Sequence, residues 1–308
     1  MTLDESSEDL LARICPDMMG SAVDHLLFRV ERVGKVLGVR LEDGREVVVK
    51  MHPPGTSLAR LRAVHSARAV LTDAGFPCPE AVLAPVRLPT GPADTVERLV
   101  TGGGAGRPRS SEHRRAMVEA FSWHMELLHD YPARSVLREA PAWANVGSRP
   151  GLWPPPHDPA LRFHAIPETR WIDDLASTAL GELRTYHGPF ALAHCDWEAQ
   201  NMVFDDGRVH AVWDWESLLT ARRACLVGFA AGCYTAQHSP ADAPSPPEVG
   251  LFLDEYAEVS GSPWTKRDRR AAAAATLWLI SYNARFEHAA GVASGPWLTA
   301  LTADYLNV

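Results

Sequence analysis

The chain has 308 residues, more than a typical single domain, so we expect one large domain or two smaller lobes. Hydrophobic residues make up 46% of the sequence, which is enough for substantial cores and unlike a disordered chain. The formal net charge of −8 argues against a general nucleic-acid-binding protein.

The five cysteines indicate a protein that keeps its thiols reduced. Their number is odd and no two of them form a C-x-x-C pair, which argues against a disulfide framework or a zinc site. Reduced thiols are typical of the cytoplasm, where we expect this protein. The N-terminal segment is acidic and polar, and no apolar run approaches the ~18 residues of a membrane span. We therefore expect no signal peptide and no membrane contact.

The N-terminal part of the chain has the pattern of a small sheet with one helix. Stretches rich in β-branched residues predict strands over 28–33, 36–41 and 46–50. Lys50 ends the third of these strands. A helix is predicted over 57–74 and another strand over 95–100. The glycines from Gly102 to Gly104 are typical of a flexible linker, so we place a lobe boundary here and expect domains at 1–101 and 102–308.

The remainder of the chain is predicted to be mostly helical, with one irregular excursion. Helices are predicted over 111–130, 171–186 and 276–291. A proline-rich, aromatic stretch over 131–170 is too irregular for a helix. Trp278, Tyr282 and Arg285 have the spacing of one helix face. For the stretch and for this face, two interpretations stay open: contact with a substrate, or packing within the lobe.

The most informative segment, 194–216, combines two aspartates and an asparagine around a hairpin. His194, Asp196 and Asn201 have the spacing H-x-D-x-x-x-x-N, and Asp214 comes thirteen positions after Asn201. Protein kinases have this spacing for their catalytic base and their magnesium ligands. A lone H-x-D or D-W-E is common by chance, but the full ordered set around a hairpin is much less common.

The hairpin gives a physical reason for the spacing. Asp206-Gly207 is a tight-turn signal, and the stretches on both sides of it are rich in β-branched and aromatic residues. With this turn Asn201 falls opposite Val212, and Asp214 shares the face of Asn201. Two oxygen ligands then converge at the open end of the hairpin. Mg²⁺ prefers few carboxylates together with phosphate oxygens and water, so we expect it there.

At these residues the sequence resembles the aminoglycoside phosphotransferase and choline kinase superfamily, small-molecule kinases with a protein-kinase-like fold. Its members typically contain H-x-D-x-x-x-x-N, a hairpin and then I-D-W-E, and this chain has Val212-Trp213-Asp214-Trp215-Glu216. The resemblance covers nearly the whole chain and is strongest over 192–217. It implies an α+β, bilobal protein-kinase-like fold with a small, mostly β N-lobe and a larger, mostly α C-lobe.

The resemblance also implies the activity and the partners. We expect a phosphotransferase that moves the γ-phosphoryl group of ATP or GTP to a hydroxyl of a small substrate, with Mg²⁺ as cofactor. Asp196 is expected to accept the hydroxyl proton, and Asn201 and Asp214 to bind the metal. An antibiotic, in resistance or self-resistance, is the first choice of acceptor, and choline, homoserine or a thiosugar is the alternative. A nucleotide-binding pseudokinase is the other class of function, although retention of these three residues argues against it.

In the N-lobe the resemblance implies three nucleotide contacts. Lys50 ends the sequence Val-Val-Val-Lys and is expected to contact phosphates, although a strand-end lysine taken alone is more often exposed. The main chains of Glu97 and Leu99 are expected at an interlobe hinge that contacts the purine.

The chain departs from the family pattern at two places. Relatives carry a glutamate in the middle of the helix over 57–74, which pairs with the strand lysine, and this helix has His65 near that position. Either His65 substitutes, another residue holds Lys50, or His65 is a surface histidine. Relatives also contain a D-L-A motif after the hairpin, whose acid braces the catalytic loop. Residues 222–228 lack this acid, so another residue must brace the loop.

Overall fold

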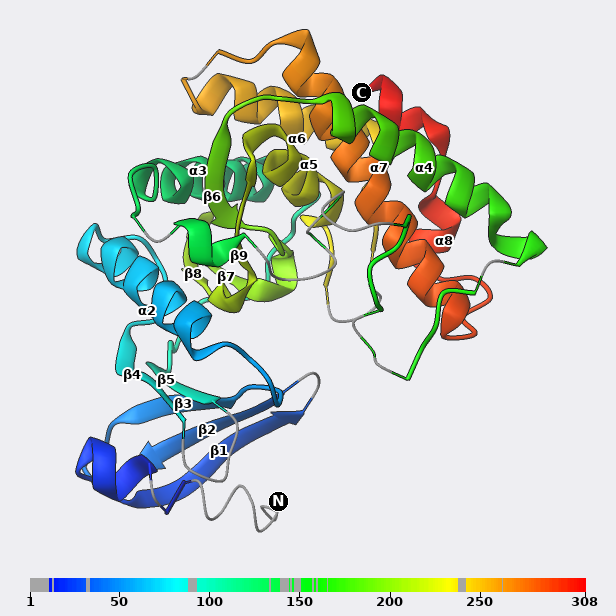
Figure 1. Ribbon diagram of the computed structural model, residues 1–308. Helices are drawn as coiled ribbons and strands as arrows, with labels where there is room; N and C mark the ends of the chain where they lie inside the picture. Colours follow the sequence, from blue (N-terminus) through cyan, green and yellow to red (C-terminus); the bar gives the residue numbers. More distant parts are fainter. Residues whose placement is uncertain are drawn as a thin grey trace. The chain divides into compact units, whose positions relative to one another are not determined.

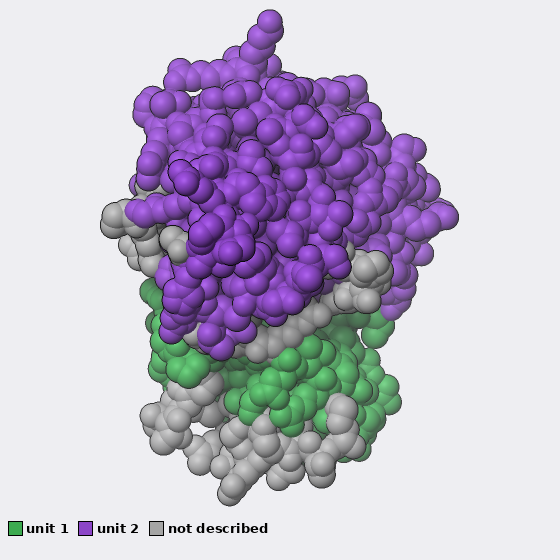
Figure 2. Space-filling view, turned by 90° about the vertical axis from the view of Figure 1, so that its right-hand side faces the viewer, with its two compact units in different colours: residues 1–101 green, residues 102–308 purple. Residues whose placement is uncertain are grey.

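The computed structural model describes residues 11–308 except 13, 32–33, 88–92, 133, 139–143, 145, 147–150, 157, 159, 165, 238–241 and 262. The chain divides into two compact units, Met1–Thr101 (unit 1) and Gly102–Val308 (unit 2), which Figure 2 colours separately. Unit 1 is built around a β-sheet and unit 2 is mostly helical. The predicted α+β class is therefore confirmed.

The described residues of unit 1 form a five-stranded antiparallel sheet in the order β1-β2-β3-β5-β4 (Figure 1). A short helical turn, η1 (Ile14–Met18), precedes the sheet. The strands are β1 (Val23–Glu31), β2 (Lys35–Leu41), β3 (Glu46–Met51), β4 (Ala81–Arg87) and β5 (Ala93–Arg98). Leu37, Val47 and Val49 lie on one face of the sheet and are buried in a cluster with Ile14. Because successive residues of a strand point to opposite faces, Lys50 lies on the other face.

Helix α2 (Leu58–Asp73) follows β3 and packs against β4. The side chain of Ser57 caps it by accepting the N–H of Arg60, and the chain leaves the helix through Gly75, whose φ of 77° suits glycine. The buried face of α2 includes Leu61 and also Arg68, whose exposed fraction is only 3%. Helix α2 therefore buries a positive charge.

Unit 2 contains helices around two short antiparallel strand pairs. The α-helices among its described residues are α3 (Ser111–Leu127), α4 (Arg170–Thr185), α5 (Arg223–Cys233), α6 (Pro246–Val259), α7 (Lys266–Ala289) and α8 (Pro296–Ala300). The 3₁₀ turns are η2 (Arg134–Leu137), η4 (Pro167–Thr169), η5 (Ala199–Asn201), η6 (Trp215–Ser217) and η7 (Ala303–Asn307). The strand pairs are β6 (Phe190–His194) with β9 (Leu218–Arg222), and β7 (Met202–Asp205) with β8 (Arg208–Val212). In the described part of the chain, no helix combines the length and apolarity that a membrane span needs.

Helix α7 is the central helix of unit 2 and packs against both α4 and α5 (Figure 1). It begins at Lys266, earlier than predicted, because Thr265 and Asp268 form a reciprocal capping box there. Gly228 of α5 lies against α7, and the hydroxyl of Thr276 donates a 2.7 Å hydrogen bond to the Gly228 carbonyl. A Cβ atom on Gly228 would lie 2.2 Å from the carbonyl oxygen of Ala272. Glycine is therefore required where the two helices approach.

We expect Gly228→Ala to destabilise the protein by about 1–3 kcal/mol, because the added methyl forces α5 and α7 apart. The matched control is Gly181→Ala in α4, where a Cβ would meet no atom within 4 Å. Alanine is the better helix former, so this control should gain about 0.5–1 kcal/mol. Urea unfolding of both variants measures the difference, and equal effects would contradict the close approach of the helices.

Candidate active site

The hairpin of β7 and β8 has the predicted turn but not the predicted register. Asp206 and Gly207 have φ values of 46° and 72°, which suit a two-residue turn with both central residues left-handed. A bulge then places one extra residue, His210, on β8. Asn201 therefore lies opposite Trp213, whose N–H donates to the Asn201 carbonyl at 3.0 Å. The predicted position opposite Val212 is wrong by one residue, because residue spacing alone does not reveal a bulge.

Asp214 follows this pairing directly but leaves the strand geometry. Its φ of 65° is left-handed, a conformation that costs most residues about 1–2 kcal/mol and that aspartate tolerates better than most. The alternation argument for its face therefore does not apply. Its position depends instead on Trp213, which is hydrogen-bonded to Asn201, and on the 3.1 Å bond from the Ser217 N–H to the Asp214 carbonyl. The chain thus places Asp214 at the same end of the hairpin as Asn201.

Asn201 and Asp196 are in direct contact. The Nδ2 atom of Asn201 donates to the Asp196 carbonyl at 3.0 Å and to Asp196 Oδ2 at 3.3 Å. These two acceptors orient the amide, so Asn201 Oδ1 is directed away from Asp196. Burial raises the pKa of Asp196 to about 6, and the hydrogen bond from Asn201 opposes this rise. The carboxylate thus takes up a proton more readily than an exposed aspartate does.

His194 connects the Asp196 loop to the strand that leads to Asp214. Its Nδ1 atom accepts the Asp196 N–H at 3.2 Å, so this nitrogen carries no proton. The proton is then on Nε2, which donates to the Trp213 carbonyl at 3.1 Å. One neutral ring thus holds both sides of the site in place.

A second neutral histidine, His124 of α3, supports the first. Its Nε2 atom accepts the main-chain N–H of His194 at 3.2 Å, and its Nδ1 donates to the Ala120 carbonyl at 3.2 Å. The His124 ring is fully buried, and burial lowers its pKa to about 3. His124 is therefore neutral at every pH at which the protein is expected to work.

Helix α3 supports the loop that carries Asp196, a task that the acid of the missing D-L-A motif performs in relatives. The indole Nε1 of Trp197, next to Asp196, donates to the Met117 carbonyl at 3.1 Å, and the Trp197 ring stacks on His124 at 5.0 Å. Phe121 packs edge-on against both rings. Sequence reasoning did not find these brace residues. The one signal in the sequence was the helical spacing of Met117, Phe121 and His124, which are four and three residues apart.

The donor atoms suit magnesium at Asn201 and Asp214, because amide and carboxylate oxygens are hard ligands. Among the described residues, Asp196, Glu198 and Cys233 also lie close together, with ligand atoms within 4.8 Å of one another. Burial and the neighbouring carboxylates raise the pKa of Cys233 well above its usual value. A protonated thiol is a poor ligand for Mg²⁺, so this group does not suit that ion.

The glycine segment after residue 101 is not simply a flexible linker. Gly104 exchanges two main-chain hydrogen bonds with Phe204 of β7, at 2.8 and 2.9 Å. A Cβ on Gly103 would lie 3.0 Å from Val203, and one on Gly106 would lie 2.4 Å from the Phe204 ring. Glycine is needed here because the chain passes close to the hairpin.

The aromatic face of α7 packs against the proline-rich stretch. Trp153 lies 6.1 Å from Trp278 and 6.4 Å from Tyr282 between ring centroids, and its indole N–H donates to Asp173 at 2.8 Å. Arg285, which is 2% exposed, lies 3.4 Å from the same carboxylate. Of the two open interpretations, these contacts support packing. Part of the stretch, 139–143 included, lies outside the described residues.

In unit 1 the side chain of Lys50 is only 12% exposed, so Lys50 is not a surface residue. Its Nζ atom lies 3.2 Å from Oε1 of Glu97, which makes Glu97 a side-chain partner as well as a predicted main-chain contact. The Leu99 N–H donates to the Glu46 carbonyl at 3.0 Å. Contact of the Glu97 and Leu99 main chains with a purine stays a prediction. His65 is half-buried, and burial together with the charge of Arg68 lowers its pKa.

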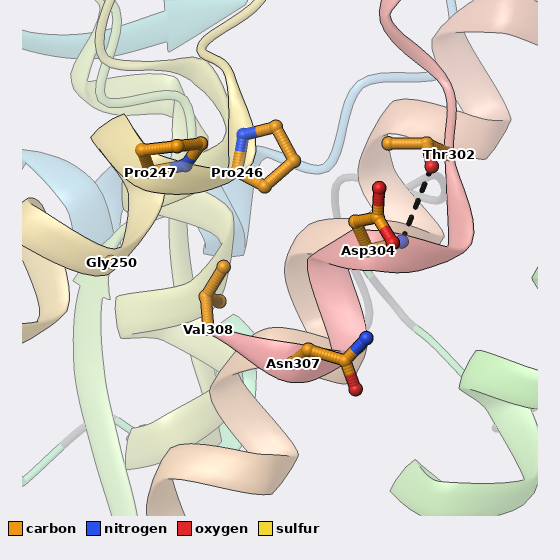
Figure 3. A pocket seen from close by; sticks show the side chains of 7 residues that line it. All are labelled: Pro246, Pro247, Gly250, Thr302, Asp304, Asn307 and Val308. Atoms are coloured by element: carbon orange, nitrogen blue, oxygen red, sulfur yellow. Dashed lines mark hydrogen bonds between the residues drawn. The ribbon is translucent and has the colours of Figure 1, made fainter.

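The described surface also has hollows lined by other residues. One, of about 590 Å³, lies between the first turn of α6 and residues 302–308 (Figure 3). Figure 3 shows Thr302 accepting a hydrogen bond from the Asp304 N–H. The lining contains none of the predicted site residues, so we assign it no part in the site. Another, of about 630 Å³ in unit 1, includes Leu99 in its lining.

The buried neutral ring of His124 predicts a pH-dependent stability. An exposed imidazole has a pKa of about 6.5, so below that pH the unfolded chain binds a proton at His124 and the folded chain does not. The stabilisation is complete above about pH 6.5 and falls with pH, by up to about 1.4 kcal/mol per unit, towards the folded pKa of about 3. His124→Gln retains an acceptor but does not titrate, so the slope of unfolding free energy between about pH 4 and 6.5 should become shallower.

The control is His129→Gln, because His129 is exposed and its ring is in water in both states. Urea unfolding at several pH values compares the variants. A slope that His124→Gln leaves unchanged would contradict the buried neutral ring.

Comparison with known proteins identifies the family of the chain. Residues 36–244 match the model of the phosphotransferase enzyme family (APH). No curated protein sequence matches the chain significantly. Among solved structures, the amicoumacin kinase hAmiN in complex with AMP-PNP, Ca²⁺ and Ami is 10% identical, with 98% of this chain and 92% of that chain covered and a TM-score of 0.70.

Two further structures show the same fold. The GDP complex of aminoglycoside 2'-phosphotransferase-IIIa is 11% identical, with 99% of each chain covered and a TM-score of 0.64. The Plasmodium vivax ethanolamine kinase Pv091845 is 15% identical, with 98% of this chain and 89% of that chain covered and a TM-score of 0.58. At these identities the structures establish the fold alone. With the family model matching more than half of its length, the chain belongs to the phosphotransferase enzyme family.

Proposed function

We propose that this phosphotransferase transfers the γ-phosphoryl group of ATP or GTP to a hydroxyl of an antibiotic. The observation that carries the proposal is the hydrogen-bonded set around His194, which joins the Asp196 loop to the strand leading to Asp214. Asn201 belongs to the same set through its bonds to Asp196 and Trp213. A base and two oxygen ligands in one connected set suit phosphoryl transfer better than simple binding.

Each residue has a distinct role in this proposal. Asp196 accepts the proton of the attacking hydroxyl, and the raised pKa of its carboxylate suits that task. Asn201 and Asp214 hold Mg²⁺, which when bound neutralises the charge of the nucleotide phosphates. Lys50 in unit 1 contacts the phosphates, so we assign nucleotide binding to unit 1 and catalysis and acceptor binding to unit 2. Most of the acceleration then comes from positioning and charge neutralisation.

The acceptor is inferred from what the structural relatives act on. An amicoumacin kinase and an aminoglycoside phosphotransferase act on antibiotics, which supports an antibiotic acceptor and a role in resistance. An ethanolamine kinase has the same fold, so a metabolite alcohol is the second candidate. The proposed location is the cytoplasm, where nucleoside triphosphates are available.

A transfer screen tests the proposal. The purified protein is incubated with Mg²⁺ and ATP or GTP, and with panels of antibiotics and of metabolite alcohols. Phosphorylation appears as a gain of one phosphoryl group in the mass spectrum. Transfer to an antibiotic supports the first candidate, transfer only to alcohols supports the second, and nucleotide binding without transfer to any acceptor would favour a pseudokinase.

We expect Asp196→Asn to lower transfer by about 10²–10⁴-fold, because the amide no longer accepts a proton. Its oxygen still accepts the hydrogen bond from Asn201, so fold and nucleotide affinity should stay nearly unchanged. The control is Asp205→Asn, which removes an exposed carboxylate at the turn of the same hairpin. Turnover at the wild-type rate by Asp196→Asn would refute the assignment.

Asp214→Ala should weaken magnesium-dependent nucleotide binding more than Asn201→Ala does. A carboxylate contributes charge as well as coordination, whereas a neutral amide contributes coordination alone. Calorimetric titration with nucleotide, with and without Mg²⁺, measures both variants. The assignment fails if Asp214→Ala keeps the magnesium dependence of the wild type.

A further inference from the structure

Three charged side chains meet in the interior of unit 1. Glu97 of β5 lies between two cations, with Oε1 3.2 Å from Lys50 Nζ and Oε2 2.9 Å from Nη1 of Arg68. The exposed fraction of the side chain is 5% for Glu97, 12% for Lys50 and 4% for Arg68. Buried charges of this kind persist only when they are paired, so the carboxylate is what allows both cations to lie here.

The sheet determines which residue pairs with Lys50. On the neighbouring strands β3 and β5, Lys50 lies opposite Thr95 and Val48 lies opposite Glu97. Residues two apart on a strand share a face, and diagonal neighbours on adjacent strands are within reach of long side chains. The Glu97 side chain therefore reaches Lys50 across the strands without any help from helix α2.

Helix α2 contributes a cation to this group and not an acid. Arg68 contacts Glu97 with one nitrogen, and another, Nη2, donates to the carbonyl of Pro79 just before β4. The guanidinium is thus held at two points, and it holds the Glu97 carboxylate in turn. The group of Lys50, Glu97 and Arg68 has a net charge of +1. A phosphate group is a suitable ligand for such a buried positive charge.

We infer that Glu97 is the positioning residue for Lys50 in nucleotide binding, with Arg68 fixing the Glu97 carboxylate. The inference rests on the proposed function, since it gives Lys50 a phosphate to contact. The Lys50 amine is a point charge on a flexible four-carbon chain, and Glu97 confines it to one place. The acid that holds the strand lysine therefore comes from β5, and His65 is not needed for this task.

The test is a double-mutant cycle with Glu97→Gln, Lys50→Met and the double variant. Affinity is measured by calorimetry with Mg²⁺ and a non-hydrolysable ATP analogue, and kcat/KM by phosphoryl transfer. Glu97→Gln alone should lower kcat/KM by up to about a hundredfold, the cost of misplacing a contact. In the Lys50→Met background it should cost nothing further, because no amine remains to be positioned.

The controls separate positioning from folding. Glu80→Gln removes the carboxylate of an exposed ion pair with Arg98 in the same sheet, and should change neither constant. His65→Ala should cost less than about tenfold. Because Glu97→Gln leaves two cations facing each other, Glu97→Asp is included, which keeps the charge and shortens the reach. Urea unfolding confirms that each variant is folded.

A readout without nucleotide tests the pair itself. The rate at which Lys50 is acetylated by acetic anhydride, measured by mass spectrometry, should rise in Glu97→Gln, since the carboxylate no longer holds the amine, while Lys35 and Lys266 react as before. Unchanged Lys50 labelling, or equal losses from Glu97→Gln with and without Lys50, would overturn the positioning role. Wild-type protein that binds no nucleotide would instead overturn the proposed function, whatever the labelling shows.

Discussion

The candidate catalytic segment of unit 2 depends on one neutral imidazole ring. His194 accepts the Asp196 N–H with one nitrogen and donates to the Trp213 carbonyl with the other. Only the neutral Nε2–H tautomer makes both bonds, because a protonated ring has no acceptor. The loop that carries Asp196 and the strand that leads to Asp214 are therefore held at a defined separation by a group without charge.

The next residue in this network is also an uncharged histidine. His124 is neutral and uses both of its nitrogens, and it stacks on Trp197 within the aromatic cluster of α3. A carboxylate in this position would have to be desolvated, which costs several kcal/mol unless it is fully paired. A buried neutral histidine avoids that cost, and the packing of α3 then decides where the loop lies. Among the described residues, this brace takes the place of the acid that the segment after β9 lacks.

In unit 1 a buried side chain is held by an ion pair. Lys50 carries a charged amine, so burying it requires a carboxylate nearby. Glu97 meets this requirement from the neighbouring strand, while Arg68 balances the second oxygen of the carboxylate. The two units thus differ: in unit 2 uncharged rings hold the main chain of the Asp196 loop, and in unit 1 a carboxylate holds a cation.

Local chemistry made much of this protein predictable from its sequence. The Asp206-Gly207 turn, the strands around it and the spacing of Asp196 and Asn201 all follow from residues close together in the chain, where turn and strand preferences act directly. The helix over 57–74 follows from periodicity in the same way. The α+β class came from the resemblance of residues 192–217 to a known family.

Tertiary structure decided the contacts between distant segments. The bulge at His210 moved the register by one residue, and pairing between strands, which no single strand encodes, is what reveals it. The contact of Glu97 with Lys50 exists because β3 and β5 are neighbours in the sheet. The contact of His124 with His194 exists because α3 packs beneath β6. Each joins side chains far apart in sequence, whose approach depends on how the whole unit buries its apolar surface.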